Sequence, residues 1–169
     1  METTLEEKAK VFAEQAHARL FQVRKYTGEP YITHPASVVG IVRSVVHTEA
    51  MLAAAWLHDT VEDTDFTIEP LTEREFGAEV AALVEQLTDV SRLSDGNRKA
   101  RKAIDLAHTA KASAAAQTIK LADLIDNTGN IVERDPDFAK GYLKEKTLLL
   151  EVLADGNPDL WLQAKKNLG

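Results

Sequence analysis

A histidine and an aspartate stand side by side at the end of an apolar stretch. His58 and Asp59 follow residues 50–57, all of which are apolar. Burying an imidazole and a carboxylate at the end of a buried helix costs free energy unless the groups are paired or bind a metal ion. Glu62 and Asp63 follow four residues later, so three carboxylates and one imidazole fall within six residues. Because these carboxylates repel one another, the pattern favours a divalent cation site.

A further carboxylate follows an apolar turn in the stretch Lys120-Leu121-Ala122-Asp123. Asn127 lies four residues after Asp123, so the two side chains share one face if this segment is helical. Taken alone, Asp123 is interpreted as an exposed helix carboxylate. It becomes a candidate ligand only in combination with other motifs.

The elements that must position these side chains are predicted to be helical almost throughout. Apolar residues recur at helical spacing, and Gly and Pro mark the breaks between helices. No stretch alternates at period two over the length of a strand. We therefore predict an all-α fold, a single globular helical array forming one domain over residues 1–169. The predicted helices cover residues 5–20, 34–45, 49–60, 67–76, 78–87, 98–107, 112–132, 138–153 and 160–164.

Composition excludes several classes of protein. The chain has 169 residues, of which 44% are hydrophobic and 28% charged, as in a folded globular domain rather than a disordered chain. The net charge of −7 argues against a general nucleic-acid-binding protein or a basic membrane-surface helix. The absence of cysteine excludes disulfides, iron–sulfur clusters and thiol nucleophiles. The first residues do not resemble a secretion signal, and the longest apolar run is too short to span a bilayer, so we expect a cytoplasmic protein.

The charge is distributed unevenly along the chain. Residues 91–120 carry seven basic and two acidic side chains, whereas residues 61–90 carry one basic and nine acidic side chains. One interpretation of the basic segment is a set of solvated helix faces. The other is a local cationic wall for an anionic ligand, and the charge pattern alone does not choose between them.

Four motifs occur in order between residues 24 and 123, and together they resemble the hydrolase domain of RelA/SpoT homologues, in the HD-domain superfamily. The resemblance covers about residues 8–153. The HD dipeptide alone is a weak signal, but the first two motifs together are specific. The motifs are Arg24-Lys25-Tyr26-Thr27-Gly28-Glu29-Pro30-Tyr31-Ile32-Thr33-His34-Pro35, Leu57-His58-Asp59-Thr60-Val61-Glu62-Asp63-Thr64, Phe76-Gly77-Ala78-Glu79-Val80-Ala81-Ala82-Leu83-Val84 and Lys120-Leu121-Ala122-Asp123.

The resemblance implies one manganese ion as cofactor. The family's two histidine and two aspartate ligands match His34, His58, Asp59 and Asp123. Imidazole and carboxylate ligands suit a borderline-to-hard divalent ion, but they do not by themselves select manganese over iron or magnesium.

The resemblance also implies the remaining site residues and the reaction. Glu62 and Asp63 match the pair that positions or activates the attacking water, while Arg24, Lys25 and Asn127 match residues that contact the nucleotide. The implied substrate is a small nucleotide, (p)ppGpp, whose 3′-pyrophosphate is hydrolysed to leave GDP or GTP. In this scheme the ion polarises the phosphate and lowers the pKa of a bound water.

One segment departs from the family pattern. Long members read Asp-Arg-Leu-His-Asn-Met-Arg-Thr, whereas this chain reads Asp123-Leu124-Ile125-Asp126-Asn127-Thr128-Gly129-Asn130. The change leaves two alternatives open: a hydrolase of another phosphorylated nucleotide, such as an adenosine alarmone or the 2′-phosphate of NADPH, and a non-catalytic nucleotide sensor. Residues 154–169 are too few for the synthetase, TGS and ACT regions of long members, so we expect a small stand-alone alarmone hydrolase, comparable to the metazoan members of the family.

Overall fold

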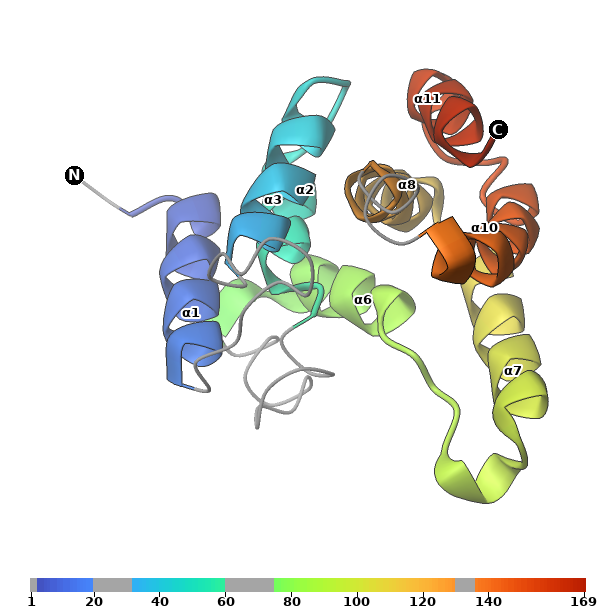
Figure 1. Ribbon diagram of the computed structural model, residues 1–169. Helices are drawn as coiled ribbons and strands as arrows, with labels where there is room; N and C mark the ends of the chain where they lie inside the picture. Colours follow the sequence, from blue (N-terminus) through green and yellow to red (C-terminus); the bar gives the residue numbers. More distant parts are fainter. Residues whose placement is uncertain (1–2, 20–31, 60–74, 130–135) are drawn as a thin grey trace. The chain divides into compact units, whose positions relative to one another are not determined.

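The computed structural model describes residues 3–19, 32–59, 75–129 and 136–169. Within these ranges the chain forms α-helices and one short 3-10 helix, and no strand is present, which confirms the all-α prediction. The contacts divide the chain into two compact units, Met1–Glu85 and Gln86–Gly169 (Figure 1). Each unit is described separately, and the single domain over residues 1–169 stays a prediction.

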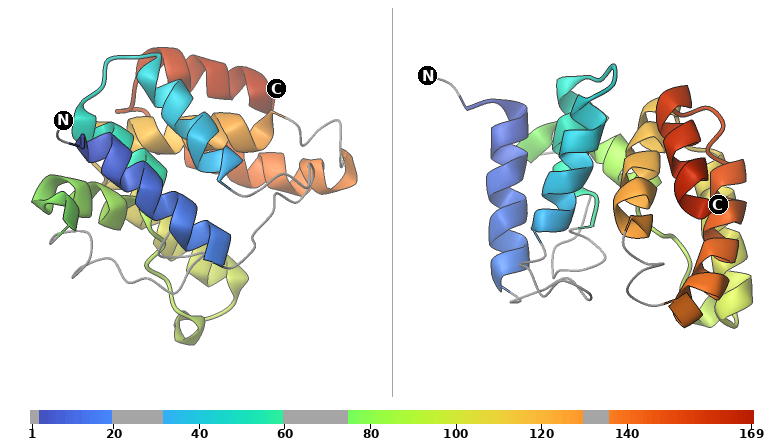
Figure 2. Two further views of the ribbon diagram at one scale, coloured as in Figure 1. Left: turned by 90° about the vertical axis from the view of Figure 1, so that its left-hand side faces the viewer. Right: turned by 45° about the horizontal axis from the view of Figure 1, so that its top comes forward.

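The first unit is built around a central helix. It contains α1 (Leu5–Arg19), α2 (Thr33–Arg43) and α3 (Glu49–Leu57), and α6 (Ala78–Leu87) begins in it. Helix α3 packs against both α1 and α2, and the three lie side by side in both views of Figure 2. Because α3 has neighbours on both sides, it carries apolar residues around its whole circumference, and residues 50–57 are all buried.

Helix α3 has well-defined ends. Thr48 caps its N-terminus, where the hydroxyl oxygen accepts a hydrogen bond from the Met51 N–H at 3.2 Å. The helix ends at Leu57 rather than continuing to residue 60, so the predicted C-terminal boundary is wrong. The physical reason is local, because the side chain of His58 bonds to the carbonyl of Ala55 in the last turn.

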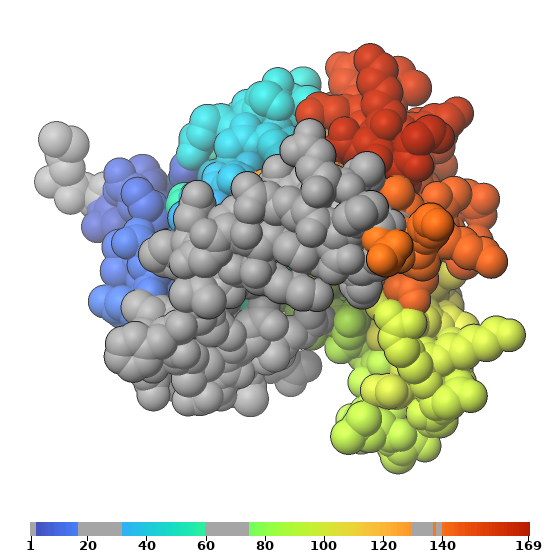
Figure 3. Space-filling model, viewed as in Figure 1, coloured from blue at the N-terminus to red at the C-terminus, as the bar shows by residue number. Residues whose placement is uncertain are grey.

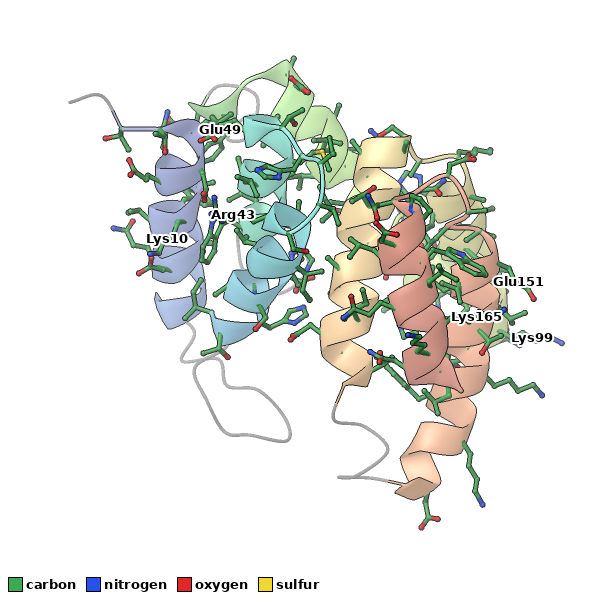
Figure 4. The ribbon with its side chains drawn as sticks, turned by 90° about the horizontal axis from the view of Figure 1, so that it is seen from above. Lys10, Arg43, Glu49, Lys99, Glu151 and Lys165 are labelled. Carbon is green, nitrogen blue, oxygen red and sulfur yellow. The ribbon has the colours of Figure 1, made fainter. Side chains whose placement is uncertain are left out.

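Polar contacts connect the outer helices of the first unit at its surface. Arg43 of α2 donates to both carboxylate oxygens of Glu6, and the backbone N–H of Glu6 donates to Oε1 of Glu49 at 2.9 Å. Figure 4 shows Arg43 and Glu49 beside α1. On the buried side, the rings of Phe12 and Phe76 meet edge to face at 5.7 Å.

The second unit is built around α8. Its elements are η1 (Leu93–Asp95), α7 (Arg98–Ala110), α8 (Ala114–Thr128), α10 (Pro136–Glu151) and α11 (Pro158–Leu168). Helix α8 packs on α10 and α11, which also pack on each other (Figures 1 and 2). Helix α7 has no buried residue, and its side chains stand at the surface of this unit in Figure 3.

The turn between α10 and α11 fixes the position of α8. Gln117 of α8 donates from Nε2 to the carbonyl of Ala112 at 3.1 Å and accepts from the Asp155 N–H at 3.0 Å. The hydroxyl of Thr118 accepts from the Asn157 N–H at 3.0 Å. Both polar side chains are buried, so their hydrogen bonds hold the turn against the helix. No helix in the described part of the chain is long and apolar enough to cross a membrane.

Candidate functional site

Two histidines and an aspartate of the first unit converge. His34 lies in the first turn of α2, His58 follows the last residue of α3, and Asp59 comes next. The Asp59 Oδ2 atom lies 3.0 Å from Nε2 of His58 and 3.6 Å from Nε2 of His34. One possible ligand atom from each residue lies within 4.8 Å of the others.

The backbone sets the orientation of His58. Its Nδ1 lies 2.6 Å from the carbonyl oxygen of Ala55, a distance at which Nδ1–H donates to that acceptor. With the proton on Nδ1, the lone pair of Nε2 points toward Asp59. Histidines that bind metals are held in the same way, by a hydrogen bond from the second ring nitrogen to a carbonyl or carboxylate.

The surroundings of the cluster suit a divalent cation. His34 is 3% exposed and His58 is 4% exposed, and their rings meet edge to face at 5.3 Å. The Asp59 side chain is more accessible, at 16%. Two buried imidazole nitrogens therefore face a carboxylate that solvent can reach, a donor set of nitrogen and oxygen that suits divalent transition metals. The chemistry of the cluster supports a divalent metal without selecting manganese.

In the second unit, two neighbouring side chains of α8 contact the carboxylate of Asp123. Asn127 donates from Nδ2 to Asp123 Oδ1 at 3.2 Å, which confirms that the two side chains share one face of α8. The ammonium of Lys120 lies 3.4 Å from Asp123 Oδ2. Asp123 is 8% exposed, so the interpretation of this residue alone as an exposed helix carboxylate is wrong.

Four of the predicted site residues lie outside the described part of the chain. They are Arg24, Lys25, Glu62 and Asp63. Their predicted contacts with nucleotide and water stay predictions.

The basic segment of residues 91–120 divides into two kinds of side chain. Lys99 extends from α7 into solvent (Figure 4). Arg98 instead donates to both carboxylate oxygens of Glu145 on α10, and Lys102 lies 3.9 Å from the same carboxylate. Part of the segment is thus a solvated face, and part meets α10.

One charged residue near Asp123 was not singled out from the sequence. Lys146 of α10 places its ammonium 5.1 Å from the ring centroid of Tyr142, one turn earlier. Burial lowers the pKa of Lys146, the nearby charges of Lys120 and Lys102 lower it further, and the Asp123 carboxylate opposes this shift. The i, i+4 spacing to Tyr142 is the only sequence signal for this position.

Comparisons with known proteins place these observations in context. Residues 9–154 match the family described as HD domain. A guanosine-3′,5′-bis(diphosphate) 3′-pyrophosphohydrolase of Drosophila melanogaster is 38% identical over 119 residues, covering 69% of this chain and 63% of that protein. The corresponding mouse protein is 41% identical, covering 66% and 62%. A probable enzyme of the same name from Synechocystis is 36% identical, but only 19% of its length is covered. The chain thus spans less than two thirds of these relatives.

A solved structure matches nearly the whole chain. It is described as a metazoan ortholog of SpoT that hydrolyses ppGpp and plays a role in starvation responses. The match has a TM-score of 0.84 at 29% sequence identity and covers 99% of this chain and 95% of that one.

Proposed function

This chain belongs to the HD-domain family, and on that premise we propose that it is a metal-dependent hydrolase of the 3′-pyrophosphate of (p)ppGpp. Water attacks phosphorus, the bond to the 3′ oxygen breaks, and the products are GDP or GTP and pyrophosphate. The convergence of His34, His58 and Asp59 is the observation that carries this proposal. The relatives named as 3′-pyrophosphohydrolases, at 38% and 41% identity, support the choice of substrate.

We propose manganese as the ion, with His34, His58 and Asp59 of the first unit and Asp123 of the second unit as ligands. Two features support Asp123: it is a buried carboxylate, and an amide orients it through a hydrogen bond. Ligating carboxylates are held in the same manner in known metal sites.

Each of the proposed site residues has a specific role in this reaction. When bound, the ion supplies Lewis-acid stabilisation of the charge that develops on the phosphate. Glu62 and Asp63 orient the attacking water and accept its proton. Arg24 stacks its planar guanidinium on the base, and Lys25 adds positive charge. Asn127 both orients Asp123 and binds the nucleotide. Its amide donates one N–H to Asp123 and offers a second N–H and a carbonyl oxygen to the nucleotide.

The reaction can be tested directly. Purified protein is stripped of metal with a chelator, supplied with Mn²⁺, Fe²⁺ or Mg²⁺, and incubated with (p)ppGpp. We expect stoichiometric release of GDP or GTP and pyrophosphate, fastest with Mn²⁺. Absence of pyrophosphate release with every ion, while (p)ppGpp binds, would support the nucleotide-sensor alternative.

A matched pair of histidine variants tests the metal centre. His47 lies in the same unit and also bonds a backbone carbonyl through Nδ1, at 2.7 Å from Val45 O, but it is not part of the converging cluster. We expect His58→Ala to lose bound metal and activity and His47→Ala to keep both. Equal metal content in the two variants, measured by inductively coupled plasma mass spectrometry, would contradict the assignment of His58 as a metal ligand.

Another phosphorylated nucleotide is the second candidate substrate. The sequence after Asp123 differs from the family pattern, and Leu124, which replaces an arginine of long members, is 1% exposed. A buried leucine supplies no charge for a substrate. A panel containing (p)ppGpp, adenosine alarmones and NADPH separates these substrates by their kcat/KM values. We further propose that the protein acts in the cytoplasm on such small molecules, rather than on nucleic acid or at a membrane, as its net charge of −7 supports.

A further inference from the structure

Helix α11 and the turn before it are hydrogen-bonded to α8 at two places. At the first, the Asn157 N–H donates to Oγ1 of Thr118 at 3.0 Å. At the second, Asn167 donates from Nδ2 to Oγ1 of Thr128 at 3.2 Å and to the carbonyl of Ile125 at 3.3 Å. The two asparagines are ten residues apart, and so are the two threonines. Because α-helices share one rise per residue, helices that run side by side in the same direction meet at both contacts.

The two threonines have closely matched surroundings. Both are buried, and each hydroxyl also donates to the carbonyl four residues earlier, Ala114 at 2.9 Å for Thr118 and Leu124 at 2.7 Å for Thr128. Asp123 lies five residues from each threonine. At about 100° per residue, Asp123 is about 140° around the helix from either one. The contacts with α11 are therefore on the side of α8 that faces away from Asp123.

Only the second contact adjoins a residue of the proposed nucleotide site. Asn127 directly precedes Thr128 in the last turn of α8, whereas Thr118 lies nine residues earlier, about 14 Å along the helix axis. Carbonyl groups in the last turn of a helix need donors from outside the helix, and Asn167 supplies one to Ile125. The turn that carries Asn127 is thus held by a side chain of α11.

This contact belongs to the segment in which the chain departs from the family pattern. Thr128 stands where long members have methionine. A methionine has no hydroxyl, and its thioether is only a weak acceptor for an amide N–H. The hydrogen bond between Asn167 and Thr128 is therefore a feature of this chain that the family pattern does not supply.

Packing alone is the simpler explanation for Asn167, because hydrogen bonds between buried polar groups hold helices together in many cores. The contact of Asn157 with Thr118 is an example on the same pair of elements. The two explanations differ in what they predict. If both contacts only stabilise the fold, their removal has the same effect on the reaction, whereas a role toward Asn127 belongs to the second contact alone.

We propose that Asn167 is a positioning residue, which fixes the last turn of α8 so that Asn127 meets the nucleotide in one orientation. This inference rests on the proposed function for the role of Asn127. Asn167 bonds to the side of the helix that faces away from Asp123, so it acts through Asn127 rather than on the reacting phosphate. Its effect is on affinity for the nucleotide more than on the chemical step.

The first test compares Asn167→Ala with Thr118→Val, which removes a matched hydroxyl far from Asn127. Steady-state hydrolysis of (p)ppGpp is measured with Mn²⁺ at equal metal content. We expect Asn167→Ala to raise KM about fivefold, the value of one hydrogen bond, with little change in kcat. Thr118→Val is expected to keep the KM of wild type, although it also loses a buried hydrogen bond. Equal KM values for the two variants would overturn the positioning role.

A double-mutant cycle shows whether Asn167 acts through Asn127. In an Asn127→Ala background, adding Asn167→Ala is expected to raise KM no further, because the group that it positions is gone. The same fivefold rise in both backgrounds would contradict the proposal. If Asn167→Ala does not fold, as judged by circular dichroism, Asn167→Asp takes its place. The aspartate keeps the size of the side chain and lacks the N–H donors, so an unchanged KM there counts equally against the proposal.

Amide hydrogen exchange separates this inference from the proposed function. Exchange in the last turn of α8 is followed by mass spectrometry without nucleotide, and we expect it to be faster in Asn167→Ala but not in Thr118→Val. Unchanged exchange in Asn167→Ala would overturn the positioning role. Hydrolysis of (p)ppGpp with a KM that does not depend on Asn167 would remove that role and leave the function intact. Binding of (p)ppGpp that weakens in Asn167→Ala, without hydrolysis by wild type, would retain the role and remove the function.

Discussion

Gly156 provides a sharp test of how α8 is positioned. It lies in the turn between α10 and α11, and a Cβ atom added there would meet Leu121 Cδ1 at 2.6 Å. The same atom would lie 3.1 Å from the Gln117 carbonyl carbon and 3.2 Å from the Thr118 backbone nitrogen. The leucine methyl can turn aside, but the two backbone atoms belong to α8 and move only with the helix. We therefore expect Gly156→Ala to push the turn away from α8.

The expected cost follows from two opposing effects. Overpacking a well-packed contact destabilises by about 1–3 kcal/mol. Replacing glycine by alanine also restricts the unfolded chain, which stabilises by about 0.4–1 kcal/mol where the backbone conformation allows alanine. Gly156 is not among the glycines with positive φ, so this gain applies. The net expectation is a loss of about 1–2 kcal/mol in the free energy of unfolding, measured by urea denaturation.

Gly141 supplies the matched control. It lies inside α10, and a Cβ atom added there would meet no atom of the described residues within 4 Å. Gly141→Ala is therefore expected to stabilise the protein, by up to about 1 kcal/mol, from helix propensity alone. The two substitutions are chemically identical and should have opposite signs. A Gly156→Ala variant as stable as wild type, or a destabilised Gly141→Ala variant, would refute the packing argument.

Three further predictions concern the metal centre and the local contacts of the two units. Asp59→Asn is expected to keep its fold and lose bound metal, since it removes the carboxylate that both imidazoles face; metal content equal to wild type after chelation and reloading would count against the proposed ligand set. Thr48→Ala is expected to cost about 1 kcal/mol in thermal or urea unfolding through loss of the N-cap of α3, whereas an unchanged midpoint would argue against that cap. Asp105→Asn is expected to cost about 1–2 kcal/mol at neutral pH, because the carboxylate accepts hydrogen bonds from the Val90 N–H and from the N–H and hydroxyl of Ser91. Although burial raises the pKa of Asp105, these hydrogen bonds and the charge of Lys102 lower it on balance, so the wild-type advantage is present at neutral pH and is lost as the pH falls below about 4. A difference between wild type and variant that persists at pH 2 would contradict this reasoning.

Local sequence signals predicted most of the helices. The predicted helix at residues 78–87 matches α6, which follows Gly77, a glycine with φ of +92° that separates it from residues 75–76. The predicted helix at 5–20 is observed as α1 over Leu5–Arg19, and residue 20 lies outside the described part of the chain. Glycine, proline and capping residues act within a few positions of themselves, so their effects can be read along the chain.

Boundaries set by side-chain contacts were less predictable. The helix predicted over 112–132 begins at Ala114, where the hydroxyl of Ser113 accepts from the Ala116 N–H. The helix predicted to begin at residue 138 begins at Pro136, and the short turn predicted over 160–164 is a full helix, α11, capped by Asn157. For α8 and α11, several residues near the boundary are compatible with a helix start, and the capping contacts of Ser113 and Asn157 select one.

By itself the sequence determined the all-α class and, through motif order, the candidate ligands His34, His58 and Asp59. The neighbouring positions of His58 and Asp59 make their proximity unavoidable, and an i, i+4 spacing does the same for Asp123 and Asn127. Only the tertiary structure decided that Asp123 is buried and that the charges of Lys120 and Lys102 act on Lys146. Spacing along one helix is fixed by its geometry, whereas the charged surroundings of Lys146 depend on how α7, α8 and α10 pack. That packing depends on distant contacts, such as Gly156 against α8, which no local pattern records.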